Sequence, residues 1–274
     1  MTSVLRVSLI VSTYNAADYL ARVLRAVANQ TCLPDEVLLA DDGSGEDTRK
    51  LFADWAAAQT LGAQHVWQPH EGFRKAGILN RAIARARADY IVFLDGDMIP
   101  HPQFLADHKQ LARDRSFVQG HRVLIGERAA QWFGRNSFPR DRRRACWQGQ
   151  LSGWKQAFRW PRPLVRQRAD LRGVRGCNLG LWREDLVRVN GYNEAFVGWG
   201  REDSDLAVRL MNAGVTRLDA RGWGLCYHLW HPPVSRTELP TNDELLADAI
   251  EQRATRCASG LDQHLGKDDA HSPA

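Results

Sequence analysis

Two clusters of acidic residues in this sequence have the types and the spacing that chemistry requires. Asp95 and Asp97 flank a glycine at the end of the apolar run 90–94, and Glu202 and Asp203 open an amphipathic stretch after a Gly-Trp-Gly sequence. A carboxylate pair of the first kind can hold a divalent cation against a nucleotide diphosphate, and the second offers a carboxylate that can deprotonate a hydroxyl. Together they predict transfer of a sugar from a nucleotide.

Two histidines are candidate metal ligands. His228 and His231 lie three residues apart, just before two prolines. A single histidine beside an apolar strand is more often a core residue than a ligand, but this pair favours at least one ligand. Mixed imidazole and carboxylate ligation suits Mn²⁺ better than Mg²⁺, which prefers oxygen ligands. We therefore expect Mn²⁺, with Mg²⁺ as the alternative, held by Asp97 and histidine.

The first hundred residues alternate between the periodicities of strands and helices. We expect strands at 4–11, 36–40, 65–68 and 90–94, and helices at 16–30, from 46 onward and at 75–87. This alternation predicts an α/β fold, a mostly parallel sheet flanked by helices, whose ligands bind beyond the carboxyl ends of the strands.

Polar residues follow each of these strands. Thr13 and Asn15 come after the first strand, Asp41 after the second, Arg74 after the third and Asp95 after the fourth. All of them should lie at one edge of the sheet. The sequence has neither a G-x-G-x-x-G motif after the first strand nor a P-loop motif, which argues against dinucleotide redox enzymes and P-loop nucleotidases.

The length of 274 residues, with 44% hydrophobic residues, fits one domain with a substantial core. We expect this domain to span 1–240, with a nucleotide-sugar half at 1–100 and a smaller acceptor and metal half at 101–240. Later elements should be a strand at 177–182, helices at 183–190 and 202–213, one or two strands within 216–228, and a terminal helix at 243–265 within a C-terminal helix and tail, 241–274.

The positive charge is concentrated in one segment, 135–175, which we expect to consist of loops and short helices. It holds twelve basic residues against two acids, a net charge of +10, whereas the whole chain carries +5. Such a concentration implies a local anionic partner. Since the segment also holds three tryptophans, we expect it to form the acceptor-side wall and to recognise an anionic glycolipid. A solvated basic surface without a ligand is the alternative.

Cysteine content and hydropathy suggest a cellular location. Five cysteines without C-x-x-C spacing argue against a disulfide framework or a cysteine zinc site, and fit a reducing cytoplasm. No apolar run approaches the roughly 18 residues of a membrane span. We therefore expect a cytoplasmic protein, either soluble or peripheral at the inner membrane surface.

Three motifs resemble known glycosyltransferases. The segments 11–15, 30–31 and 36–44 look like the opening of family 2 glycosyltransferases of the GT-A fold, and 198–203 is similar to a motif of β-galactosyltransferases and bacterial chondroitin-type polymerases. The resemblance covers about residues 4–100 and 176–231. It implies a GT-A-type fold, a UDP-sugar donor and a glycan or glycolipid acceptor, in synthesis of bacterial surface polysaccharide or lipooligosaccharide.

The resemblance also implies roles in donor binding. Asp41 would contact the uracil ring, with Thr13 lining the same pocket. In a purely structural interpretation Asp41 lies in a turn where Ser44 caps the next helix, with Asp47 completing the capping pattern. The two interpretations are compatible, since a cap formed by Ser44 would leave the Asp41 carboxylate available for the uracil ring.

Further donor-site residues follow from the same resemblance. Asp97 would ligate the metal directly, while Asp95 would contact ribose or a metal-bound water. His228 matches the chondroitin-polymerase pattern, whereas the H-x-x-H spacing resembles the galactosyltransferase pattern and favours His231. Also expected at the nucleotide-sugar site are Asn15, Gly96, Asn80, and Arg74 or its neighbour Lys75 on the diphosphate.

On the acceptor side the resemblance makes Asp203 the catalytic base. Glu202, Trp199 and Gly200 would hold the acceptor, with Trp199 stacked on a sugar face. Related retaining enzymes carry Asn at position 203, so Asp203 favours inversion. The simpler interpretation is that these acids complement a helix dipole, which contributes only ~0.3–1 kcal/mol.

Two other classes of function are weighed against this one. The basic, tryptophan-containing segment could indicate nucleic-acid binding, but Asp41, Asp95, Asp97 and Asp203 in one cleft would repel phosphates unless a cation intervened. A sugar nucleotidyltransferase should carry a Gly-rich basic loop after its first strand, where this chain has 12–15, Ser-Thr-Tyr-Asn. We therefore expect no nucleic-acid partner.

Overall fold

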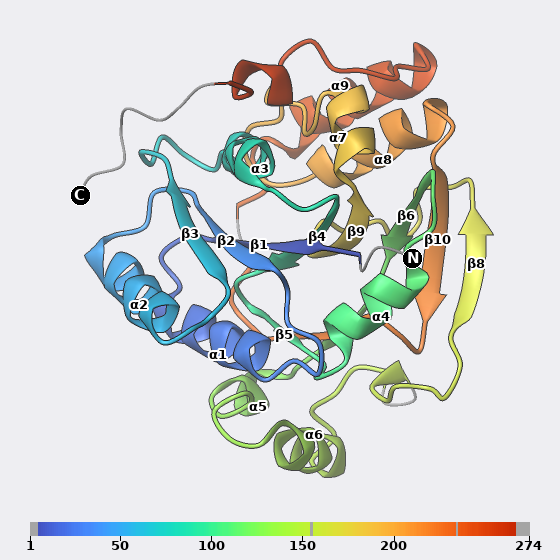
Figure 1. Ribbon diagram of the computed structural model, residues 1–274. Helices are drawn as coiled ribbons and strands as arrows, with labels where there is room; N and C mark the ends of the chain where they lie inside the picture. The colour runs from blue at the N-terminus through green and yellow to red at the C-terminus, as the bar shows by residue number, and fades with distance from the viewer. Residues whose placement is uncertain (1–4, 154–155, 234, 267–274) are drawn as a thin grey trace.

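The computed structural model describes residues 5–153, 156–233 and 235–266, and contains two sheets (Figure 1). The eight-stranded sheet has the order β3-β2-β1-β4-β9-β6-β10-β8, and the three-stranded sheet the order β5-β11-β7. The elements are β1 (Val7–Thr13), α1 (Ala17–Ala28), β2 (Glu36–Asp41), α2 (Glu46–Ala57), β3 (Gly62–Trp67), α3 (Lys75–Arg85), β4 (Tyr90–Asp95), β5 (Met98–Pro100), α4 (Phe104–Leu111), β6 (Ser116–Gln119), β7 (His121–Leu124), α5 (Glu127–Ala130), α6 (Phe138–Trp147), β8 (Leu164–Arg168), β9 (Asn178–Trp182), α7 (Arg183–Val189), α8 (Glu202–Asn212), β10 (Thr216–Arg221), β11 (Leu225–His228) and α9 (Leu239–Glu251), then a 3₁₀ turn at Leu261–Gln263.

The first half of the sheet is parallel, as expected from the alternation of strands and helices in the sequence. β1 pairs in parallel with β2 and with β4, and β2 pairs in parallel with β3. Every residue of β1 is buried, which is typical of a central strand covered on both faces. The register sets Ser12 opposite Asp95 and Thr13 opposite Asp41. The strand ends therefore form one row of polar residues.

The second half of the sheet is mixed. β9 runs antiparallel to both β4 and β6, with Asn178 opposite Leu94. Because its direction is reversed, β9 begins where β4 ends. Residues 176–178 therefore lie at the same edge as the Asp95–Asp97 segment, which a purely parallel sheet would not allow.

The small sheet joins two segments that are far apart in the sequence. β11 pairs antiparallel with β5, with His228 opposite Met98, and parallel with β7. The backbone N–H of Leu229 donates to the Asp97 carbonyl oxygen at 3.0 Å. This pairing brings the C-terminal histidines beside Asp97.

Helices cover both faces of the large sheet (Figure 1). One apolar core includes residues of α1, α2 and α4, and the other includes residues of α3, α7 and α8. In α1 the side chains of Leu20, Val23, Leu24 and Val27 are all buried, so the stripe recognised in the sequence faces the sheet. The α/β fold with a mostly parallel sheet is confirmed.

Two expectations about the second half were wrong. The segment 135–175 contains β8, which pairs with β10 at the edge of the large sheet, as well as α6. The terminal helix spans Leu239–Glu251 instead of 243–265. The expected tail overlaps residues 267–274, which lie outside the described part, as do Trp154 and Lys155 of the basic segment.

All five cysteines are free thiols. No helix among the described residues is long and apolar enough to cross a membrane.

Candidate active site

Asp97, His228 and His231 form a compact group of potential metal ligands. The Nε2 atoms of His228 and His231 lie 3.3 and 3.2 Å from Asp97 Oδ2, and the three donor atoms all lie within 4.8 Å of one another. The sequence left open which histidine joins Asp97. The structure brings both to the carboxylate, so both can contribute a ligand atom.

The electrostatics of this group fit a cation. Burial opposes ionisation of Asp97, but hydrogen bonds and charge interactions with His228 and His231 outweigh it and hold the pKa of the carboxyl well below its usual value. Its hydrogen bond to Asp97 raises the pKa of His231 to about 9. Asp97 Oδ1 is buried and has no hydrogen-bond partner among the described residues. An imidazole and carboxylate donor set with an unsatisfied oxygen suits a Mn²⁺-type ion.

Asp95 lies at the end of β4 in a network of its own. Its Oδ1 accepts hydrogen bonds from the Ser12 hydroxyl and from Lys75 Nζ, each at 2.7 Å. Burial would disfavour the ammonium form of Lys75. The charges of Asp95, Asp203 and Glu202 outweigh burial and raise the pKa of this lysine well above its usual value. Lys75 therefore links the two acidic clusters that the sequence singled out.

Asp203 lies in the first turn of α8 against the start of β9. A methyl group added to Gly176 would lie 1.9 Å from Asp203 Oδ1, so the absence of a side chain at Gly176 is what admits the carboxylate. Burial raises the pKa of Asp203, while the Lys75 ammonium and the backbone N–H of Gly176 act in the opposite direction. Oδ1 has no side-chain or backbone donor assigned to it among the described residues, so it can accept a proton.

Glu202 is buried beside Asp203. Burial, followed by repulsion from the Asp203 carboxylate, raises the pKa of Glu202 to about 8. Two adjacent carboxyls in a poorly solvated place hold a proton between them more readily than two charges. Burial raises the pKa of Asp203 as well, so it favours the protonated form of both carboxyls.

The Gly-Trp-Gly loop before α8 is held in a conformation that needs its glycines. Gly198 and Gly200 have φ angles of 76° and 109°, in the left-handed region. The backbone N–H of Gly198 donates to the Phe73 carbonyl at 3.0 Å, and Asn242 of α9 donates to the Val197 carbonyl at 3.1 Å. The loop thus lies between the start of α3 and α9.

Trp199, within this loop, is 38% exposed. The Arg236 guanidinium lies 5.0 Å from the centre of its ring. An exposed aromatic face with a cation beside it is suited to contact with a sugar. Its role as an acceptor contact stays a prediction.

Asp41 differs from the expected arrangement. Its carboxylate is fully buried, accepts the backbone N–H of Ser44 at 2.8 Å and contacts His65 Nε2 at 2.9 Å. The expectation that Ser44 caps the next helix was wrong, because Gly45 is the N-cap and the Ser44 hydroxyl accepts the Asn15 N–H instead. Asp41 is therefore engaged in the loop, not left free by a cap.

Thr13, Asn15 and Gly96 lie in the loops around the strand ends. Thr13 Oγ1 is buried without a partner among the described residues, whereas the Asn15 side-chain oxygen accepts the Gly45 N–H at 3.2 Å. A methyl group on Gly96 would lie 2.8 Å from the Ser12 carbonyl oxygen. Gly96 therefore permits the close approach of the Asp95–Asp97 segment to β1.

Two of the expected donor residues, Asn80 and Arg74, make hydrogen bonds or ion pairs outside the acidic clusters. Asn80 is fully buried, and its amide donates to the Tyr192 carbonyl and to Glu194 while accepting the Tyr192 N–H. Both of its amide hydrogens and one lone pair of its oxygen are therefore used internally. The side chain of Arg74 forms an exposed ion pair with Glu71 at 2.7 Å. Its neighbour Lys75 is the cation that reaches the site.

Sequence reasoning missed two further features of the loops. Asp42 accepts hydrogen bonds from the Gln68 side chain at 2.6 Å and from the Arg74 N–H at 2.9 Å, joining the loops after β2 and β3. Tyr14 and His70 stack with ring centroids 4.3 Å apart. The presence of a second acid, Asp42, beside Asp41 was the sequence signal that could have indicated the hydrogen bonds of Asp42. Tyr14 and His70 lie in separate loops, and the sequence contains no pattern that predicts their stacking.

The basic segment is more varied than its net charge indicated. Arg159 forms a bidentate ion pair with the buried Asp107, at 2.7 and 2.9 Å, and is thus a structural residue. On α6, the Arg142 guanidinium packs 4.9 Å from the Phe158 ring centre, whereas Arg143 is exposed. Successive arginines therefore face different surroundings. Only part of the +10 charge is available to a ligand.

Comparison with known proteins identifies the family. The family model described as glycosyl transferase family 2 matches residues 8–184, and that described as the N-terminal domain of galactosyltransferase matches residues 162–232. The chain belongs to glycosyl transferase family 2. It is a glycosyltransferase, and both resemblances drawn from the sequence are confirmed.

Among relatives, chondroitin synthase of Escherichia coli is 26% identical over 84% of this chain and 35% of its own length. Validoxylamine A glucosyltransferase of Streptomyces hygroscopicus subsp. limoneus is 28% identical over 80% of this chain and 51% of its own length. The chain thus spans about a third to a half of these relatives.

Solved structures resemble the fold. Staphylococcus aureus TarS superposes with a TM-score of 0.62 at 15% identity, covering 95% of this chain and 41% of TarS. The mannosyltransferase PcManGT from Pyrobaculum calidifontis, in complex with GDP-Man and Mn²⁺, gives 0.57 at 20% identity, covering 92% of this chain and 73% of that one. At these identities the likeness supports the fold, which is that of GT-A glycosyltransferases.

Proposed function

We propose that this glycosyltransferase moves a sugar from a UDP-sugar to a hydroxyl of a glycan or glycolipid acceptor, with inversion at the anomeric carbon and dependence on a divalent metal. The observation that carries the proposal is the convergence of two sites at one sheet edge. Asp97 has His228 and His231 within 3.3 Å, and Lys75 connects Asp95 electrostatically to Asp203. A metal-assisted leaving group and a base are what a single displacement requires.

The proposed reaction is a single in-line displacement. The acceptor hydroxyl oxygen forms a bond to the anomeric carbon while the bond from that carbon to the diphosphate oxygen breaks, and the hydroxyl proton passes to Asp203. Glu202, protonated up to about pH 8, can donate a hydrogen bond to an acceptor oxygen. The positive charge of Lys75 favours the ionised form of Asp203, against the burial that raises the pKa of this carboxyl. Since the base lies opposite the leaving group in such a step, inversion follows.

The metal has a separate proposed role. Asp97, His228 and His231 would hold it, and the donor set favours Mn²⁺ over Mg²⁺. When bound, a divalent cation supplies positive charge that stabilises the departing diphosphate.

The acceptor and the location belong to the same proposal. The excess of positive charge in 135–175 supports an anionic acceptor, and the homology to a chondroitin synthase supports synthesis of bacterial surface polysaccharide, with lipooligosaccharide as another setting. We propose a cytoplasmic enzyme that can associate peripherally with the inner membrane surface. The acids of the cleft argue against nucleic acid as the ligand of this surface.

A panel of nucleotide sugars tests the donor and the metal together. With Mn²⁺ present, a UDP-sugar is expected to raise the unfolding temperature and to be hydrolysed slowly, because ligands that bind only the folded state stabilise it. GDP- and CMP-sugars are the matched controls. Equal stabilisation by all three nucleotides, or stabilisation that persists after chelation of Mn²⁺, would contradict the assignment.

Gly176→Ala tests the position of the base. The added methyl group would lie 1.9 Å from Asp203 Oδ1, so the carboxylate must move. Because a displacement of about 1 Å can cost roughly 10²-fold in rate, kcat for transfer should fall by about that factor while the donor dissociation constant changes little. Single-turnover kinetics and calorimetry measure the two quantities. A folded variant with wild-type kcat would show that Asp203 needs no such placement.

A further inference from the structure

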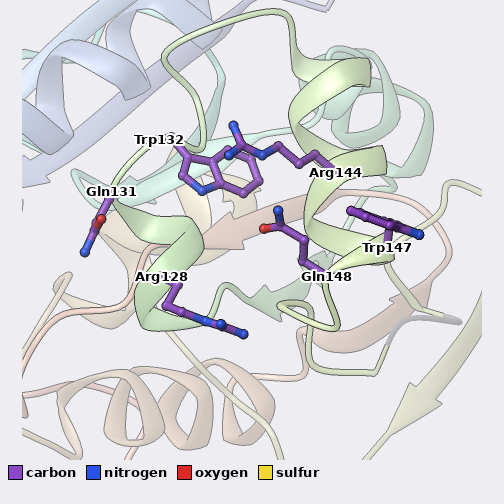
Figure 2. A pocket seen from close by; sticks show the side chains of 6 residues that line it. All are labelled: Arg128, Gln131, Trp132, Arg144, Trp147 and Gln148. Atoms are coloured by element: carbon purple, nitrogen blue, oxygen red, sulfur yellow. The ribbon is translucent and has the colours of Figure 1, made fainter.

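A cavity of about 550 Å³ lies between α5 and α6 (Figure 2). Its volume is within the range of sites for small organic ligands. The residues that line it are Arg128, Gln131, Trp132, Arg144, Trp147 and Gln148. None of them has a part in the chemistry proposed above.

The lining combines three kinds of group. It offers two guanidinium groups, two side-chain amides and two indoles, without a carboxylate. Among the described residues neither Arg128 nor Arg144 forms a salt bridge. Guanidinium groups bind carboxylates and phosphates through paired hydrogen bonds, amides bind hydroxyls, and indole faces pack against apolar faces of ligands. An anionic saccharide presents all three complementary features.

Part of the cavity wall is ordered before any ligand arrives. The Arg144 guanidinium lies 4.2 Å from the centre of the Trp132 ring, a cation–π contact that fixes its direction (Figure 2). Arg22 of α1 donates to the backbone carbonyls of Ala130 and Phe133, which holds the segment that follows α5 against α1. A preformed wall loses less conformational entropy on binding.

The cavity is close to the strand that bears a metal-site histidine. The backbone N–H of Ile125, at the end of β7, donates to the His228 carbonyl at 2.9 Å. Arg128 is three residues further along the chain, so its Cα lies within about 11 Å of that of Ile125. The segment that leads into α5 and the strand that carries His228 are thus neighbours in the fold.

We propose that this α5–α6 cavity is a second saccharide subsite, which binds an anionic sugar unit of the acceptor at a distance from the hydroxyl that is glycosylated. The anionic group is either a uronate carboxylate or a sugar phosphate. Identification of the ligand as acceptor rests on the proposed transferase function, whereas saccharide binding itself does not. A membrane surface would engage Trp147, which is 87% exposed, but would leave the cavity and its amides unused.

Calorimetric titration tests the subsite. The probes are a tetrasaccharide with uronate carboxylates, the same compound with its carboxyls reduced to alcohols, a phosphorylated oligosaccharide of the same length, and anionic phospholipid vesicles. Arg128→Gln and Arg144→Gln should each weaken binding of the uronate or the phosphorylated probe about tenfold, since each removes a charged hydrogen-bond donor. The matched control Arg143→Gln removes an exposed charge from α6 outside the cavity lining and should change binding less than about twofold.

Several outcomes would overturn the subsite. They are equal binding of the uronate and reduced probes, equal weakening by Arg143→Gln, and binding to vesicles without binding to any free saccharide. If Arg144→Gln proves unstable because its contact with Trp132 is lost, Arg128→Gln and Gln131→Ala decide the question. Mn²⁺-dependent UDP-sugar hydrolysis should be unchanged in all these variants. If the wild-type protein showed no such hydrolysis, the proposed function would be rejected. The titrations would still show whether the cavity binds an anionic saccharide.

Discussion

Asp203→Asn is expected to reduce transfer by about 10²–10⁴-fold, the usual contribution of a positioned general base. The amide keeps the shape of the carboxylate against Gly176 but cannot accept the hydroxyl proton. Donor affinity should change little, because the proposed donor contacts lie at the ends of β1, β2 and β4. The loss should therefore appear in kcat, measured in single-turnover transfer, with UDP affinity measured by calorimetry.

Glu202→Gln is the matched control for this prediction. With its pKa raised to about 8, Glu202 is protonated at neutral pH, and a glutamine preserves a neutral, hydrogen-bonding side chain. Its cost in kcat should therefore be much smaller than that of Asp203→Asn. Transfer by wild-type enzyme should rise with pH as Asp203 loses its proton. If Glu202→Gln were the more damaging change, or Asp203→Asn transferred at a near wild-type rate, Asp203 would not be the base.

The parallel half of the sheet and its polar edge could be predicted because each strand carries its own signal. β1, β2 and β4 are mostly apolar and almost wholly buried, and the polar residues at their ends meet at one edge whatever the details of packing. The strand register then aligns Asp95 with Ser12 and Asp41 with Thr13. For this part of the site, the position of a residue in the sequence nearly determines its position in space.

The rest could not be predicted because it depends on contacts between distant segments. The place of Gly176 under Asp203 follows from the reversed direction of β9, for which the sequence has no local signal. β8 was missed because the half-exposed sequence Leu-Val-Arg-Gln-Arg lacks the apolar run of a central strand. The internal contacts of Asn80 could not be predicted, because helical periodicity does not distinguish a side chain that anchors a loop from one that binds a ligand.

The second large effect is expected from Asp97→Ala. This change removes the carboxylate that both His228 and His231 contact, and with it the charge that attracts a cation. Changes even to residues that only orient metal ligands cost 10–100-fold in affinity, so loss of a direct ligand should weaken Mn²⁺ binding by about 10²-fold or more. Metal-dependent UDP affinity and transfer should then both be lost. Calorimetric titration of UDP with and without Mn²⁺ measures the change.

Asp54→Ala is the matched control, because Asp54 is an exposed acid on α2 that pairs only with Lys50 among the described residues. It should leave Mn²⁺-dependent UDP binding unchanged, as should any loss of surface charge. Chelation of the metal from wild-type protein should reproduce the defect of Asp97→Ala, since both remove the same positive charge from the diphosphate. Retention of Mn²⁺-dependent UDP binding by Asp97→Ala would mean that the cation is held elsewhere and that the histidine pair serves another purpose.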